Sequence, residues 1–575
     1  MSKRNVKLII WMLLLALGAA AAWGVVGGVA NLLASFQRGA DPASALNIVP
    51  NVPPDLYVKL TWAPDDADAG RAIEPFARGQ IEATYLRAWL QWNLSYIKGE
   101  PYGLKTYFTG PALAAAGDAV RDTTTRGLKI QQIDIEHRLQ LHFYSANGAI
   151  ASFTDHDVLV AQVIRDASGA EIYAGETRAD YEVVMMLQDG NWQVRHWVRR
   201  APEEAAESAS SAAAPARPGF VARAGTGLVL DGQPFHVAGV DYYPRDTPWD
   251  RFWTTYDPAI VDRDITLMRS LGLNTVRTFV PFQQFGGPKV DPAMLARLAD
   301  LLDRAKANDL KVILTLFDFR TDYRPLLWPE SDRHLETLLT RFRDHPAILA
   351  WDLKNEPNND YGSNGRATVD AWLAHTARLA HRYDPNHLVT IGWLTPAAAG
   401  ELADQVDLVS FHFFTPAADL REQYTALRAA VPDRPILMSE FGLPTWNSFF
   451  PNGHTEAEQA EYYADLLTYV RSSPLNGALA WTLYDFSYVP RQVAGSMPWR
   501  VGPERQLGVI RADGARKPAA ALLAPGAALD APPVPGWARF LKPFWLLVFA
   551  VVGIGVLLSA RLVVRRLSRR PAGAS

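Results

Sequence analysis

Two glutamates, Glu356 and Glu440, each follow a short apolar run of the kind that is typical of a buried strand. Glu356 stands in the order Asn-Glu-Pro at 355–357, and because proline fixes φ and lacks an N–H donor, the strand must end there. Glu440 closes a second apolar run that begins after Arg434. Two carboxyl groups at the ends of two buried strands could supply the acid/base and the nucleophile for chemistry at a glycosidic bond.

The segment 219–523 has to position these glutamates, and its pattern predicts an eightfold β/α barrel with a closed parallel sheet. Short apolar runs predict strands at 235–240, 275–278, 312–316, 349–354, 388–392, 406–412, 436–440 and 478–483. Helical patterns predict helices at 258–270, 292–307, 334–342, 368–381, 420–430 and 456–471. The connection between the fifth and sixth strands is short, which predicts a reduced helix there. In such a barrel the active site lies at the carboxyl ends of the strands, where four more candidate residues are expected: Arg277, Asn355, His412 and Trp481.

This segment resembles the (β/α)8-barrel glycoside hydrolases that carry catalytic glutamates on strands four and seven, most closely the cellulase-like family 5. The resemblance rests on five short motifs at the predicted strands. They are Leu-Asp-Gly-Gln-Pro-Phe-His-Val-Ala-Gly-Val-Asp-Tyr-Tyr at 230–243, Asn-Thr-Val-Arg at 274–277, Asn-Glu-Pro at 355–357, Ser-Glu-Phe-Gly at 439–442 and Ala-Trp at 480–481. The family often has His-x-Tyr on strand six, whereas this chain has a phenylalanine, Phe414, where the tyrosine would stand.

The resemblance implies a retaining, double-displacement mechanism with Glu356 as general acid/base and Glu440 as nucleophile. It also implies that Arg277 keeps Glu440 ionised, whereas the pKa of Glu356 must be raised for it to act as an acid. Because the two carboxyl groups suffice for this chemistry, no metal and no cofactor are expected.

Arg277, Asn355, His412 and Trp481 are expected to bind substrate. Asn355 would hydrogen-bond the sugar 2-hydroxyl, Trp481 would lie under the sugar ring, and His412 would contribute from strand six. Each candidate also has a plain structural explanation, such as a buried ion pair for Arg277 or a core position for Trp481. Their concentration at one predicted rim favours the functional interpretation.

The composition excludes several classes of function. The chain has 575 residues, too many for a single core, and therefore two or three domains. It contains no cysteine, which excludes disulfides, thiolate metal sites and a cysteine nucleophile. Its formal net charge of -3 gives no indication of nucleic-acid binding.

A smaller α+β domain is predicted at 37–200. A helix near 78–98 carries apolar residues at helical spacing. Strand-like runs separated by turn signals follow it at 128–135, 136–144, 158–164, 181–187 and 192–199. This order of elements resembles the nuclear-transport-factor-2-like (NTF2-like) domains. Low-complexity segments predict linkers at 201–218 and 524–540.

Long uncharged runs near both ends of the chain predict two transmembrane helices, within 1–36 and 541–575. A cleaved signal peptide is the alternative at the N-terminus, but the apolar run continues past its small-residue site. Basic residues precede the first run and follow the second run. The positive-inside rule therefore predicts that both termini are cytoplasmic. The catalytic domain would then be extracytoplasmic (periplasmic), attached to the cytoplasmic membrane by two helices.

The sequence therefore predicts a membrane-anchored retaining glycoside hydrolase that cleaves β-linked oligo- or polysaccharides outside the cytoplasmic membrane. Two alternatives stay open: a β-glucan transglycosylase, and an inactive sugar-binding module in envelope polysaccharide assembly. The loops that select the sugar and the linkage cannot be folded from one sequence, and protein partners are not indicated.

Overall fold

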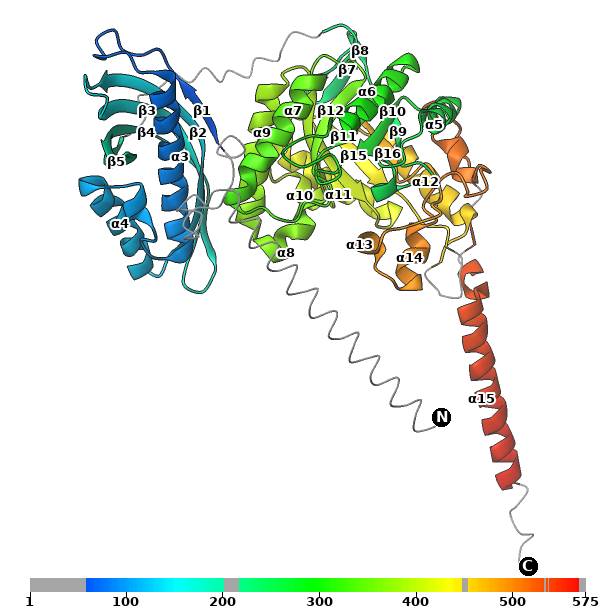
Figure 1. Ribbon diagram of the computed structural model, residues 1–575. Coiled ribbons are helices and arrows are strands. Elements are labelled where there is room, and N and C mark those ends of the chain that lie inside the picture. The colour runs from blue at the N-terminus through cyan, green and yellow to red at the C-terminus, as the bar shows by residue number, and fades with distance from the viewer. Residues whose placement is uncertain (1–57, 201–216, 447–452, 532–533, 536, 568–575) are drawn as a thin grey trace, which may run out of the picture. The chain divides into compact units, whose positions relative to one another are not determined.

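The computed structural model describes residues 58–200, 217–446, 453–531, 534–535 and 537–567 (Figure 1). The chain divides into two compact units, Met1–Ala205 and Ala206–Ser575. The transmembrane helix predicted within 1–36 and most of the predicted linker 201–218 lie outside the described residues.

The N-terminal unit is one long helix packed on a sheet, with a second helix beside it. The helices are α3 (Pro75–Lys98) and α4 (Gly110–Thr125), and the sheet order is β1 (Lys59–Trp62), β2 (Lys129–Tyr144), β3 (Ile150–Arg165), β4 (Glu171–Gln188) and β5 (Asn191–Arg200). Strands β2 to β5 form an antiparallel meander, and β1 joins β2 in parallel. Two runs predicted as separate strands, 128–135 and 136–144, form the single strand β2, because register shifts near Asp134 bend the strand without breaking it. The predicted α+β organisation is therefore present.

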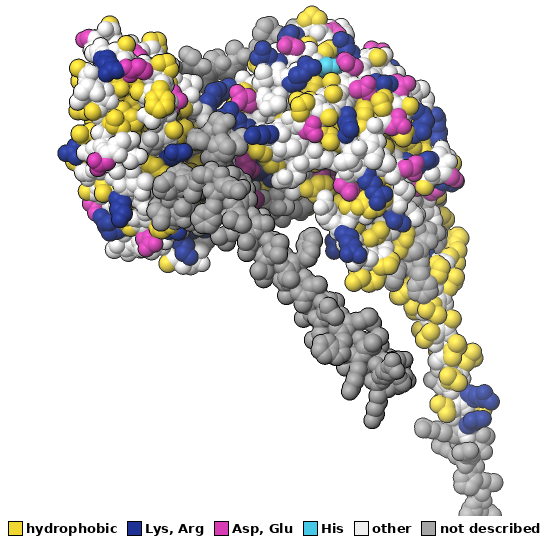
Figure 2. Space-filling model, in the orientation of Figure 1, with side chains coloured by type: hydrophobic (Ala, Val, Ile, Leu, Met, Phe, Trp, Pro, Cys, Tyr) yellow, Lys and Arg dark blue, Asp and Glu magenta, His cyan; other side chains and the backbone are white. Residues whose placement is uncertain are grey.

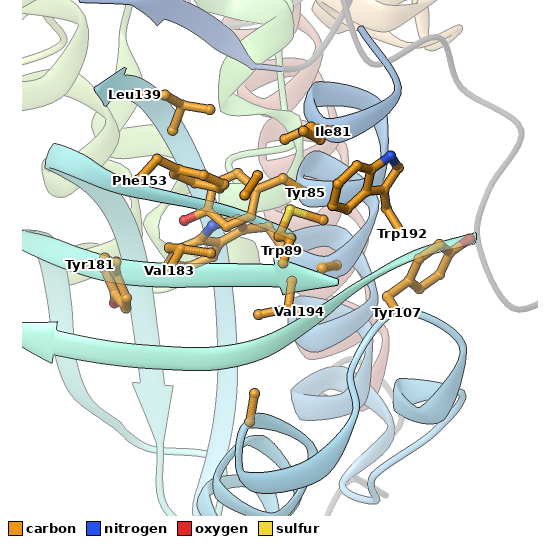
Figure 3. Packing of buried hydrophobic residues seen from close by; sticks show 14 of the residues in the cluster. Ile81, Tyr85, Trp89, Tyr107, Leu139, Phe153, Tyr181, Val183, Trp192 and Val194 are labelled. Carbon is orange, nitrogen blue, oxygen red and sulfur yellow. The ribbon is translucent and has the colours of Figure 1, made fainter. Parts of the chain in front are cut away.

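Aromatic side chains of α3 fill the core of this unit (Figure 3). The Trp89 ring lies 4.9 Å from that of Tyr181, and both residues are buried. Beside them, His137 is fully buried between two carboxylates, with Nδ1 2.6 Å from Asp155 Oδ2 and Nε2 3.0 Å from Asp134 Oδ2. Burial lowers the pKa of His137, but the charges and hydrogen bonds of the two aspartates outweigh it and raise the pKa to about 10. Both ring nitrogens therefore donate, and the group is an imidazolium held by two carboxylates.

The second unit contains a closed barrel of eight parallel strands, as predicted. The strands are β9 (Val237–Asp241), β10 (Thr275–Phe279), β11 (Lys311–Thr315), β12 (Ile348–Asn355), β13 (Leu388–Trp393), β14 (Val409–Phe413), β15 (Ile436–Phe441) and β16 (Gly477–Ala480). The main outer helices are α5 (Pro258–Ser270), α6 (Pro292–Ala307), α7 (Trp328–Phe342), α9 (Arg366–Tyr383), α11 (Leu420–Ala430) and α12 (Glu456–Ser472). The reduced helix predicted between the fifth and sixth strands is α10 (Pro396–Ala399). The predicted sixth strand, 406–412, begins later, at Val409, and the predicted eighth strand, 478–483, ends earlier, at Ala480.

The amino-terminal end of the barrel is filled by apolar side chains. Val237, Leu349 and Leu437 from three barrel strands pack together there. A hairpin made of β6 (Val221–Ala224), β7 (Gly227–Leu230) and β8 (Gln233–Pro234) adds Val221 and Leu228 to the same cluster. This end is therefore a packed core, and the opposite end of the barrel is left for polar side chains.

The chain ends in a long apolar helix, α15 (Pro543–Leu567). Within the described part of the chain it is the only helix long and apolar enough to cross a membrane, and none of its apolar window is buried. Its surface is covered by hydrophobic side chains in Figure 2. At about 1.5 Å per residue, its 25 residues exceed the roughly 30 Å of a bilayer's hydrocarbon core.

Candidate active site

The six candidate residues all come from the carboxyl ends of barrel strands. Their places are Arg277 in β10, Asn355 at the end of β12, Glu356 directly after it, His412 in β14, Glu440 in β15 and Trp481 directly after β16. Because parallel strands of a barrel end at one rim, residues far apart in the sequence meet there.

Glu356 owes its position to an unusual backbone conformation. Its φ of 47° and ψ of 51° lie in the left-handed region, which side chains other than glycine rarely adopt. Its N–H donates to the Gly392 carbonyl at 2.7 Å, and Pro357 starts a short 3-10 helix directly afterwards. Asn359 Nδ2 donates to Glu356 Oε2 at 2.9 Å. The strand therefore ends in a sharp turn that holds the carboxyl group at the barrel rim.

His412 links the two glutamates. Its Nδ1 lies 2.9 Å from Glu356 Oε1 and 3.5 Å from Glu440 Oε2. Carboxylate oxygens of the two glutamates and the imidazole nitrogen lie within 4.8 Å of one another. Retaining glycosidases hold their two carboxyl groups about 5–5.5 Å apart, whereas inverting enzymes need about 6.5–9.5 Å for an intervening water. The oxygens of Glu356 and Glu440 therefore lie closer to the shorter of these two ranges.

Arg277 lies fully buried beneath the glutamates and donates hydrogen bonds to three carboxylates. Its Nη1 donates to Glu440 Oε1 and, at 2.9 Å, to Asp241 Oδ1. Its Nε and Nη2 donate to Asp352 Oδ2 at 3.0 and 2.7 Å. Nη2 also donates to Asn355 Oδ1 at 2.9 Å, which leaves the amide NH2 of Asn355 as the group available to a ligand.

Burial and the neighbouring charges shift the pKa values of the two glutamates and of Asp241. Burial raises the pKa of Glu440 to about 8, against the opposing charges of His412 and Arg277. Burial also acts on Glu356, but the hydrogen bond and charge of His412 outweigh it and lower the pKa of that carboxyl. The pKa of Asp241 is raised to about 7 by its burial. One guanidinium cannot neutralise three carboxylates, and at Glu440 the effect of burial outweighs the charge of Arg277.

Above the glutamates lies a cavity of about 590 Å³, in the range of small-ligand sites. Its wall is partly aromatic, with Trp481, Tyr243 and Phe414 among the lining residues. Charged side chains complete it, chiefly Asp318, Lys354, Asp360 and Glu504. Apolar ring faces beside carboxylates and amides are the surfaces that sugars require.

A family model described as cellulase (glycosyl hydrolase family 5) matches residues 230–487, which include every residue of this cluster. Residues 230–487 belong to glycosyl hydrolase family 5. This segment is therefore an O-glycosyl hydrolase domain of the cellulase-like family 5.

Several known proteins are similar to this chain. Mannan endo-1,4-beta-mannosidase 3 of Arabidopsis thaliana is 24% identical over 346 residues, 46% of this chain and 81% of the relative. Mannan endo-1,4-beta-mannosidase 2 of Oryza sativa subsp. japonica is 25% identical over 407 residues, 54% of this chain and 89% of the relative. Among solved structures, an exo-beta-1,4-mannosidase from Opitutaceae bacterium strain TAV5 is 20% identical and covers 51% of this chain and 59% of its own, with a TM-score of 0.43.

Two of the residues predicted to bind substrate do not line the cavity. Arg277 and His412 are fully buried and do not line the cavity; they contact the glutamates from below. The reason is that both stand inside strands whose side chains point into the barrel at that level. Asn355 and Trp481 do line the cavity of the family 5 domain, together with both glutamates.

Sequence reasoning missed Asp241, Asp352 and Glu504. The two aspartates had a signal, because each is a charge inside or ending an otherwise apolar strand, where a buried partner is required. Glu504 had none, since it reaches the cavity from a short helix beyond the last strand, α14 (Pro498–Glu504). Burial raises its pKa to about 7, and the nearby charge of Glu356 adds to the rise.

The same cluster offers possible metal ligands, Glu356, His412 and Glu440. A cation there would lie beside the permanent positive charge of Arg277, which already contacts Glu440. The donor set of the family 5 domain is therefore better matched to proton transfer than to metal binding.

Proposed function

We propose that this chain is a membrane-anchored, retaining glycosidase that hydrolyses β-1,4-linked mannan-type or related glucan chains outside the cytoplasmic membrane. The observation that carries the proposal is the close spacing of Glu356 and Glu440, whose oxygens lie within 4.8 Å of each other. The choice of mannans is supported by the relatives, which include several mannan endo-1,4-beta-mannosidases.

In this mechanism Glu440 attacks the anomeric carbon while Glu356 protonates the leaving oxygen. A water molecule, activated by Glu356, then hydrolyses the glycosyl–enzyme bond. The working state needs the proton on Glu356, and His412 Nδ1 lies between the two carboxyl groups where it can pass the proton from Glu440. Arg277 stabilises Glu440 once it is ionised, and the Asn355 amide donates to the sugar 2-hydroxyl.

The anchor and its orientation belong to the same proposal. α15 supplies one span, and the basic residues in its C-terminal part, Arg561 and Arg565, favour a cytoplasmic C-terminus. The uncharged run near the N-terminus would supply the second span. We also propose that the N-terminal unit is NTF2-like, since a long helix packs on its antiparallel meander.

The test compares the full chain with Glu440→Gln on β-mannans, β-glucans and aryl β-glycosides. We expect the variant to lose activity by several orders of magnitude, and the first product of the native chain to keep the β configuration in NMR spectra. Glu401→Gln, in an ion pair with Arg366 outside the cavity, is the matched control and should stay active.

Four results would contradict the proposal. Full activity of Glu440→Gln, or a first product of inverted configuration, would exclude the retaining pair. Products longer than the substrate would indicate a transglycosylase. Binding of oligosaccharides without turnover would indicate a sugar-binding module.

A further inference from the structure

A basic and apolar surface lies on two short helices after the last barrel strand, α13 (Arg491–Ala494) and α14. Met497 and Trp499 are 50% and 53% exposed, although such side chains are usually buried. The exposed cations Arg491, Arg500 and Arg505 accompany them. Between 491 and 506 the only carboxylate is Glu504, which lines the cavity. We call Arg491, Met497, Trp499, Arg500 and Arg505 the α13–α14 surface.

The α13–α14 surface is part of the catalytic rim. Other residues of the same two helices, Gln492, Val493 and Pro503, line the active-site cavity. α14 packs tightly on the connection that follows β15, because a Cβ on Gly502 would lie only 2.6 Å from Trp446 Nε1. Directly after α14, the Gln506 carbonyl accepts a hydrogen bond from the Thr445 N–H at 2.8 Å.

The apolar helix α15 starts at this same rim. Lys542 is buried and its Nζ lies 3.9 Å from Glu458 Oε1, in the first turn of α12. Because α12 follows β15, its first turn lies at the end of the barrel where the active site is. At the other end of α12, Arg471 donates to the carbonyls of Ala524 and Ala527. Ala527 therefore lies beside the last turn of α12, and Lys542 lies beside its first turn, at the catalytic end of the barrel.

No linker separates the last contact with the barrel from the first residue of α15. Lys542 contacts α12, and Pro543 is already the first residue of the helix. If α15 spans a bilayer, the catalytic rim must stay at the membrane surface. Tryptophan and methionine beside arginines are the side chains that suit this interface, since the rings enter the headgroup region and the guanidinium groups attract anionic lipids.

We propose that the α13–α14 surface docks on the bilayer that α15 spans, so that the active-site cavity opens at the membrane surface. This inference rests on the anchoring part of the proposed function. The substrate class that follows is a β-linked glycan held at the membrane surface, not a polymer reached at a distance.

The lack of cysteine makes a direct test possible, since a single introduced cysteine carries the only label. Four variants of the full chain, Met497→Cys, Trp499→Cys, Gly553→Cys and Ala307→Cys, are labelled with an environment-sensitive fluorophore. They are reconstituted into vesicles of phosphatidylethanolamine and phosphatidylglycerol, with or without lipids that carry a quencher. Gly553 lies within α15, and the exposed Ala307 ends α6 at the opposite end of the barrel.

We expect lipid-borne quencher to reduce emission at 497, 499 and 553, with a blue shift at all three, and to leave 307 unchanged. Quenching at 553 together with unquenched, water-like emission at 497 and 499 would overturn the inference while keeping the anchor. A blue shift at 497 and 499 without quenching would place the surface against protein and would also overturn it. No quenching at 553 would instead refute the anchor, and with it this inference.

Discussion

Arg277→Lys tests the buried network beneath the active site. The guanidinium contacts Asp241, Asp352 and Glu440 from three different strands, and it is fully buried. A lysine keeps the charge, but its single nitrogen cannot reach all three carboxylates. At least two charge-assisted hydrogen bonds are then lost, each worth about 1.5–3 kcal/mol. We therefore expect the barrel to lose about 3–5 kcal/mol of unfolding free energy, the range measured when a buried ion pair is broken.

Thermal unfolding of the full chain, followed by circular dichroism, measures this loss. At an unfolding entropy of about 2.1 cal/mol/K per residue, each kcal/mol lowers the melting temperature of a domain of about 305 residues by about 1.6 °C, so the barrel transition should fall by about 5–8 °C. Arg304→Lys is the matched control, because Arg304 is partly exposed and pairs with Asp300 and Asp262 at 2.8 and 3.2 Å. Its loss should stay below about 1 kcal/mol. Equal shifts in the two variants would refute the view that the shared guanidinium holds these strands together.

Three further predictions concern the active site and the N-terminal core. In Gly392→Ala the new methyl group would lie 3.0–3.2 Å from three polar atoms of the buried network, so kcat/KM should fall about 10- to 100-fold. Gly400→Ala is the control, because its new methyl group would have neighbours at 3.8 Å or more, and kcat/KM should change little. The pKa of Glu440 rises from an ordinary 4.5 to about 8 on folding. The contribution of this carboxyl to the unfolding free energy is therefore complete below pH 4.5 and is lost as pH rises through 8. Melting curves against pH should show this decline, and Glu440→Gln should abolish it. His137→Gln should destabilise the N-terminal unit by about 3–5 kcal/mol in urea unfolding, because it leaves two buried carboxylates without their cation. The pKa of His137 rises from 6.5 to about 10, so its stabilisation is complete below pH 6.5, and the difference from the variant should shrink as pH passes 10.

The sequence predicted the barrel well because its signals are local. Apolar runs recur eight times and helical patterns follow six of them, and Pro357 marks a strand end without any tertiary information. The sequence could not predict which side chains face the cavity. Arg277 and His412 lie beneath the glutamates because of how far each strand rises in the barrel, which depends on strand tilt and register.

The raised pKa of Glu440 could not be predicted from the sequence either. One arginine beside one glutamate predicts an ionised pair, but Asp241 and Asp352 share the same guanidinium. The N-terminal unit shows a similar limit: a bulge near Asp134 keeps β2 continuous where the pattern predicted two strands, because bulges have no signal in a single sequence.

The left-handed backbone of Glu356 has a consequence for any attempt to engineer this protein. A non-glycine residue in that region costs about 1–3 kcal/mol, and a following proline further restricts the conformation. Glycine at 356 would remove this cost along with the carboxyl group. A library screened only for heat resistance would therefore favour variants that have lost the proton donor, and selection for turnover has to accompany it.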